Sequence, residues 1–149
     1  MDSSDTLYDD EYPTCDETHV SLRIYSEETP PASITERLGV EPTSIQHKGQ
    51  VRNPEGRRPV VLKHHGWFLE SENHVTSKDV RRHLDWLLDR MDERAEPLAA
   101  LMQEGARADI ACFWMSASGH GGPTLSPSQM KRMAALGVDC WFDVYFGGE

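Results

Sequence analysis

The sequence has few cysteines, no basic start followed by an apolar run, and no apolar stretch long enough to cross a membrane. Its three cysteines are an odd number without Cys-x-x-Cys spacing, which argues against a disulfide framework and against a thiolate zinc site. The lack of long apolar runs argues against a secretory signal and a membrane span. We therefore expect a cytoplasmic protein with reduced thiols and no membrane partner.

Positive charge is also scarce, because 25 acidic residues face 15 lysines and arginines, giving a formal net charge of -10. Residues 1–17 hold seven acids and no Lys or Arg, which leaves -3 for the rest of the chain. We expect residues 1–17 to be a disordered acidic tail, since they have too few apolar side chains to offset the entropy of ordering. We expect residues 18–149 to form a single domain. The acidic balance disfavours nucleic acid and favours a basic or neutral partner.

The periodicity of apolar residues predicts alternating strands and helices. Period-two alternation predicts strands over residues 19–26, 108–115 and 138–146. Helical spacing predicts helices over residues 31–38, 77–91 and 127–136, the second of them capped by Thr76 with Asp79 as the acid of a capping box. The segment 60–71 is either one long strand with a glycine irregularity or two short strands. Pro97 favours a kink, or a new helix that starts with Pro97 in its first turn.

This order predicts an α+β fold, with a two-layer sandwich of about four strands and helices on one face only. The expected order is strand, helix, strand, helix, strand, helix, strand. The outer units both end in Leu-Gly-Val, at Leu38-Gly39-Val40 and Leu136-Gly137-Val138. A duplicated βαβ unit, as in ferredoxin-like folds, is one interpretation of this match. The second face of the sheet should be at least partly open.

Several short motifs in one order carry a resemblance to a known family. They are Leu38-Gly39-Val40-Glu41-Pro42-Thr43 with Lys48-Gly49, Gly66-Trp67 leading to Ser71, His83-Leu84-Asp85-Trp86-Leu87-Leu88, Cys112-Phe113-Trp114, and Leu136-Gly137-Val138 with Phe142-Asp143-Val144-Tyr145. Over about residues 18–146 the chain resembles a bacterial family called domain of unknown function 4279. The resemblance implies a small bacterial domain with no assigned activity, and it gives no catalytic residue and no cofactor.

A basic stretch over residues 47–65 stands out against the acidic chain, and a glycine-rich loop over 118–123 precedes a predicted helix. Guanidinium groups suit phosphate or carboxylate, and backbone N–H groups at a helix start can also bind an anion. The candidates for a small-anion site are Lys48, Arg52, Arg57, Arg58 and His120. The alternatives are a solvated loop or a contact for the acidic tail at 47–65, and a flexible connection at 118–123.

The open face of the sheet offers a second candidate site. Alternation in the first and last strands places aromatic and charged residues there, a mixture that interfaces favour: Arg23, Tyr25, Trp141, Asp143 and Tyr145. The inward residues of 138–146 should then form a continuous apolar face. The alternative is that the tail or a loop half-covers these aromatics.

Catalytic groups are not evident in the pattern. Cys112 and His120 are the one pair that suggests a thiol nucleophile and its base, but Cys112 shares an apolar face with Ile110 and Trp114. The histidines give no helical pair and no thiolate partner, so we expect no metal site and no cofactor. We expect a non-enzymatic protein-interaction module, by analogy similar to immunity proteins that neutralise toxins. The alternative is a small-anion-binding domain or enzyme that uses 47–65 and 118–123.

Overall fold

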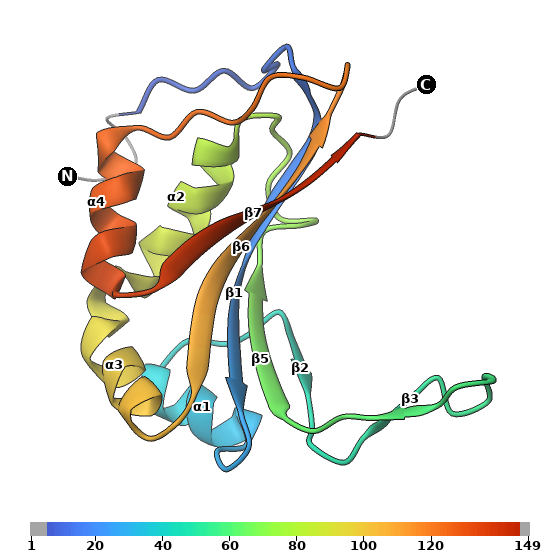
Figure 1. The fold of residues 1–149 in the computed structure, drawn as a ribbon. Helices are drawn as coiled ribbons and strands as arrows, with labels where there is room; N and C mark the ends of the chain where they lie inside the picture. Colours follow the sequence, from blue (N-terminus) through green and yellow to red (C-terminus); the bar gives the residue numbers. More distant parts are fainter. Residues whose placement is uncertain (1–5, 147–149) are drawn as a thin grey trace.

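A computed structural model describes residues 6–146, and it confirms the α+β class (Figure 1). The elements in chain order are β1 (Cys15–Ser26), α1 (Pro31–Leu38), β2 (Ser44–Gln46), β3 (Val51–Arg52), β4 (Val60–Val61), β5 (His65–Glu70), α2 (Val80–Met91), the short 3-10 helix η2 (Asp92–Arg94), α3 (Ala95–Gln103), β6 (Arg107–Ser116), α4 (Pro127–Leu136) and β7 (Asp139–Phe146). Pro97 lies in the first turn of α3, which is the second of the two alternatives considered for this segment. The expected cap of α2 is wrong: Asp79, and not Thr76, caps this helix and accepts a hydrogen bond from the Arg81 N–H at 3.0 Å, so α2 begins three residues later than expected. Among the helices of residues 6–146, none has the length and apolar character that crossing a membrane requires.

The main sheet has five strands in the order β2-β5-β1-β6-β7, one more than expected. The additional strand is β2, which lies in a polar, turn-rich stretch without a strand pattern. Strand β1 is central and antiparallel to both β5 and β6, whereas β6 and β7 are parallel. The segment 60–71 contains two strands, and they belong to different sheets: β5 joins the main sheet, and β4 pairs with β3.

The two outer units are alike in order and different in topology. Strand β5 lies between β1 and β2, which is the split βαβ pattern of ferredoxin-like folds. In the other unit, β6 and β7 are direct neighbours with α4 as the crossover. Gly39 and Gly137, the glycines of the Leu-Gly-Val repeats, end α1 and α4 with positive φ angles of 72° and 84°. The repeat therefore reflects a shared helix-stop requirement.

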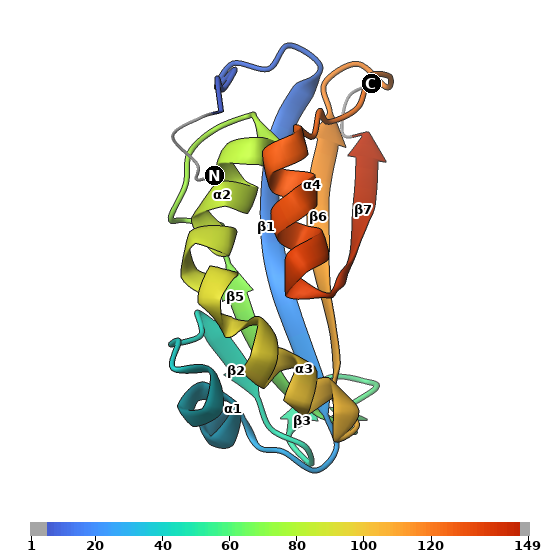
Figure 2. The same cartoon turned by 90° about the vertical axis from the view of Figure 1, so that its left-hand side faces the viewer.

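The helices of residues 6–146 lie on one face of the sheet: Figure 1 shows them beside that face, and Figure 2 looks onto them with the sheet behind. The inward side chains of β1 are fully buried beneath the helices: Val20, Leu22 and Ile24. They pack with Trp67 of β5 and with the apolar side of α2. The main core is therefore enclosed between the sheet and the helices.

The structure corrects the tail prediction for residues 6–17. Cys15 already belongs to β1, and the residues before it run along the helical side of the molecule. Asp10 accepts hydrogen bonds from Arg82 at 2.8 and 3.1 Å and from Ser77 at 2.6 Å. The ring of Tyr8 lies under the Arg82 guanidinium at 4.1 Å. Charged and aromatic contacts, which a count of apolar residues overlooks, hold this segment in place. Residues 1–5 of the predicted tail lie outside the described residues.

Candidate functional site

The face of the sheet opposite the helices contains a group of aromatic and charged side chains. Alternation along each strand turns these side chains away from the core, because their sequence neighbours point inward. We call this group the open face: His19, Arg23, Tyr25, Phe68, Asp109, Phe113, Trp141, Asp143 and Tyr145. It spans β1, β5, β6 and β7.

Arg23 occupies the middle of the open face and joins three strands. Its guanidinium makes two hydrogen bonds of 2.8 Å to the Asp109 carboxylate on β6. The guanidinium carbon also lies 5.2 Å from the Trp141 ring centre on β7 and 5.7 Å from that of Tyr25. The hydrogen bonds from Arg23 to Asp109 raise the pKa of Arg23 above its ordinary value. The charge is therefore permanent, and the fork geometry fixes where the aromatic rings lie.

Two aromatic contacts extend this arrangement in each direction. Tyr25 meets Phe68 edge to face at 5.5 Å. Towards the other end, Phe113 stacks on His19 at 4.6 Å and lies 5.3 Å from Tyr145. The side chains thus support one another while part of each surface remains accessible.

The last strand provides the most exposed members of the open face. Trp141 is 40% exposed and Tyr145 48% exposed. The Tyr145 hydroxyl donates to Asp143 at 3.1 Å, which raises the pKa of Tyr145. Large aromatic groups held at this exposure have the size and rigidity of binding anchors.

The five interface candidates from the sequence all lie on the open face, but β6 separates those of β1 from those of β7. Asp109 and Phe113 of β6 are not among the predicted interface residues, although the alternation opposite Ile110, Cys112 and Trp114 signals both. A continuous apolar inward face is also predicted for β7. That expectation is wrong at the far end of this edge strand, where Val144 is 59% and Phe146 50% exposed.

The small-anion candidates are not brought together. Lys48, Arg52, Arg57 and Arg58 are exposed on and around the β3-β4 hairpin, which projects from one end of the sheet (Figure 1). His120 is exposed in the loop after β6, at the other end of the sheet. The structure of residues 6–146 therefore forms no cleft that joins the two segments.

Cys112 and His83, which have potentially reactive side chains, are buried on the helical side of the sheet. Cys112 is buried, and its sulfur lies 3.6 Å from that of Cys140. The buried His83 contacts the Ser71 hydroxyl at 2.7 Å through Nδ1 and the Ser77 carbonyl at 2.8 Å through Nε2. Burial lowers the pKa of His83, so a neutral ring donates to the carbonyl and accepts from Ser71. Since Ser71 is fully buried, this pair fastens the chain after β5 to α2.

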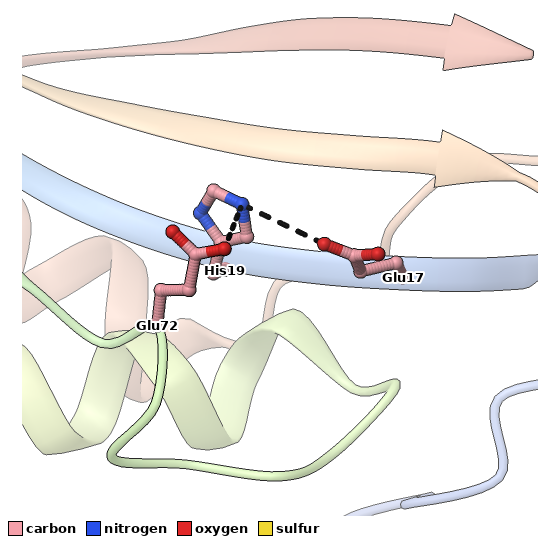
Figure 3. A group of neighbouring side chains, drawn as sticks. All are labelled: Glu17, His19 and Glu72. Atoms are coloured by element: carbon pink, nitrogen blue, oxygen red, sulfur yellow. Dashed lines mark ion pairs between the residues drawn. The ribbon is translucent and has the colours of Figure 1, made fainter.

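A group of three side chains that could bind a metal ion lies beside the upper end of β1. Glu17 and His19 of β1 and Glu72 after β5 turn towards one another, and the metal-binding atoms of the three lie within 4.8 Å of each other (Figure 3). An imidazole with two carboxylates is a set that can hold a divalent metal. No sequence pattern indicates this group, because Glu72 is distant in sequence from the other two residues.

The fold and the open face define a small α+β domain with a split βαβ sheet and one uncovered side. The chain belongs to the family described as "Domain of unknown function (DUF4279)", whose model matches residues 16–147. The match begins at the second residue of β1 and extends past the end of β7. Comparisons with curated proteins and with solved structures found no match.

Proposed function

We propose that this domain is a protein-binding module that holds its partner on the open face. The observation that carries the proposal is the exposure of Trp141 and Tyr145 on a rigid support. Arg23, fixed by Asp109, braces Trp141, and Phe113 braces Tyr145. Because these rings are already held in place, a partner would order few additional side chains on binding, which favours affinity.

The charge around the open face favours a basic partner. Outward-facing acids surround the aromatic residues on four strands: Glu17, Glu70, Asp109, Asp139 and Asp143. On the same face the cations are Arg23, which is paired with Asp109, and Arg107. With the chain itself at -10, a second copy would place like charges opposite one another. An acidic protein that binds a basic one, as in the analogy with immunity proteins, is the form of this proposal that the charges support, and we place the encounter in the cytoplasm.

The alternative function as a small-anion site now concerns the projecting hairpin alone. Arg57 and Arg58 are exposed on this hairpin, whereas His120 lies at the opposite end of the sheet. A small-anion site requires several donors that point at one position, whereas the exposed cations of the hairpin do not converge on one position. The open face is therefore the better supported site.

Photo-crosslinking from inside the open face tests the proposal. A photoreactive amino acid replaces Ala111, which faces outward between Ser21 and Trp141 in the strand pairing. The matched control carries it at Ala135, an exposed alanine of α4 on the helical side. After irradiation in the organism that makes the chain, we expect a discrete adduct with a basic protein from position 111 and none from position 135. Mass spectrometry identifies the adduct.

Two results would contradict the proposal. Equal adducts from both positions would show contact without preference for the open face. An adduct of the chain with itself would make the partner a second copy, against the charge argument.

A further inference from the structure

Strand β1 continues beyond the end of its neighbour β5, and this overhang creates a cavity. Pairing with β5 begins at Ser21, so the residues of β1 before it have no strand partner on that side. The chain after β5 and the N-terminal segment close around this edge and leave a cavity of about 490 Å³. It is separate from the aromatic centre of the open face.

Glu17, His19 and Glu72 meet at this cavity from two parts of the chain. Glu17 and His19 are two residues apart on β1 and therefore point to the same side. Glu72 follows Ser71, whose backbone N–H donates to the Val20 carbonyl at 2.9 Å and whose hydroxyl accepts from the Val20 N–H at 2.9 Å. These bonds fix the position of Glu72 relative to His19.

The imidazole of His19 is held so that one nitrogen faces both carboxylates. Its ring stacks on Phe113 with an angle of 11° between the planes. Nε2 lies 3.9 Å from a carboxylate oxygen of Glu17 and 3.9 Å from one of Glu72, as Figure 3 shows. In a tetrahedral site with bonds of about 2.0 Å, ligand atoms are about 3.3 Å apart. The two glutamates, with side chains 56% and 55% exposed, have the freedom to close the remaining distance.

The surroundings favour a cation. The cavity is lined by five acids and one lysine: Asp10, Glu11, Asp16, Glu17, Glu72 and Lys78. Carboxylates alone would suit magnesium or calcium, whereas an imidazole nitrogen shifts preference towards zinc and its neighbours in the first transition series. Three protein ligands leave a fourth position directed at the cavity.

We propose that Glu17, His19 and Glu72 form a binding site for a divalent transition metal, with zinc as the best chemical match. The metal would join the chain after β5 to the part of β1 that has no strand partner on the β5 side. His19 and Glu17 also border the open face, but the ligand here is a metal ion, and zinc binding is measured without any protein partner.

Calorimetric titration of chelator-treated full-length protein with zinc chloride is the experiment. We expect one zinc per chain, bound at least about tenfold more tightly than magnesium. The variants His19→Gln and Glu72→Gln should each weaken zinc binding by about tenfold or more, since losing even an outer partner of a metal ligand costs about 10- to 100-fold. Both side chains are at the surface, and circular dichroism checks that the variants fold.

Two matched controls separate a site from general attraction. Asp16→Asn is the control for Glu72→Gln, because it removes one negative charge from the lining of the same cavity. His65→Gln is the control for His19→Gln, because it removes an imidazole near the hairpin, whose ring centre lies 6.1 Å from that of His47. Each should change zinc affinity by about threefold or less, because screened surface charges have small effects. The proposal is overturned if the native chain binds no zinc, if folded His19→Gln binds as tightly as the native chain, or if Asp16→Asn or His65→Gln loses as much affinity as His19→Gln.

Discussion

The two faces of the main sheet differ in how deeply their side chains are buried. On β1, Leu22 and Ile24 face the helices and are fully buried, whereas Arg23 and Tyr25, their sequence neighbours, face outward and remain partly accessible. The helical side supplies the continuous core of the domain. Folding therefore places fewer requirements on the residue types of the outward face. Binding to another molecule can determine which residues stand there.

Ion pairs on the two sides show the same contrast. Arg132 of α4 and Asp85 of α2, with side chains 7% and 2% exposed, form a bridge of 3.0 Å inside the helical layer. Arg23 and Asp109 on the open face are 29% and 30% exposed. A buried pair loses most of its hydration and must be fully bonded, so it fixes how α2 and α4 pack. The pair on the open face shapes a surface that solvent still reaches.

The largest expected effect comes from shortening a side chain on the covered side. Leu22→Ala leaves a cavity under the helices and should lower the free energy of unfolding by about 2–5 kcal/mol. Ser21→Ala, one residue earlier and on the opposite face, should change it by about 0.5 kcal/mol or less. Urea unfolding of both variants measures the difference. Comparable losses would mean that the outward face of β1 contributes to a second core.

A smaller effect should follow from the N-terminal segment. Hydrogen bonds from Arg82 and then Ser77 lower the pKa of Asp10 below its ordinary value of 3.8. A lowered acid pKa stabilises the folded chain above the unfolded pKa, and this stabilisation is lost as pH falls through the folded value. Asp10→Asn should therefore cost about 0.5–1 kcal/mol at neutral pH, as for other exposed ion pairs.

The pH dependence of that cost distinguishes a docked segment from a free one. Unfolding free energies of the native chain and of Asp10→Asn should differ at pH 7, begin to converge as pH falls below 3.8, and meet once pH is below the lowered pKa of the folded state. A difference that stayed constant with pH, or was zero throughout, would remove the contact between Asp10 and Arg82 from the account.

Much of the fold could be predicted because local patterns decide it. Helical spacing predicts α2 except for its start, period-two alternation predicts β1 and β6, and Pro97 indicates either a kink or the helix start that the structure has at α3. The outward positions of Arg23 and Trp141 follow from the same alternation. For these elements, neighbours in the sequence determine which side of each element is buried.

The remainder depends on contacts between distant segments. The three-residue strand β2 exists because it pairs with β5, and its own residues have no strand signal. The docking of Asp10 depends on Arg82, and the cavity group depends on the turn that carries Glu72 towards His19. The composition of residues 1–17 indicated a free acidic tail, because composition does not show which distant cations pair with the acids.

The most direct test of the central claim is to separate binding from folding at Trp141. The variant Trp141→Ala loses a ring that is 40% exposed and one contact with Arg23, so its melting temperature should fall by only a few degrees, equivalent to about 1 kcal/mol. Affinity for the purified partner identified from position 111 should fall about thirtyfold or more, the cost of removing an anchor worth about 2 kcal/mol. A variant that unfolds like Leu22→Ala, or one that stays folded and binds with native affinity, would contradict the assignment of the open face to a partner.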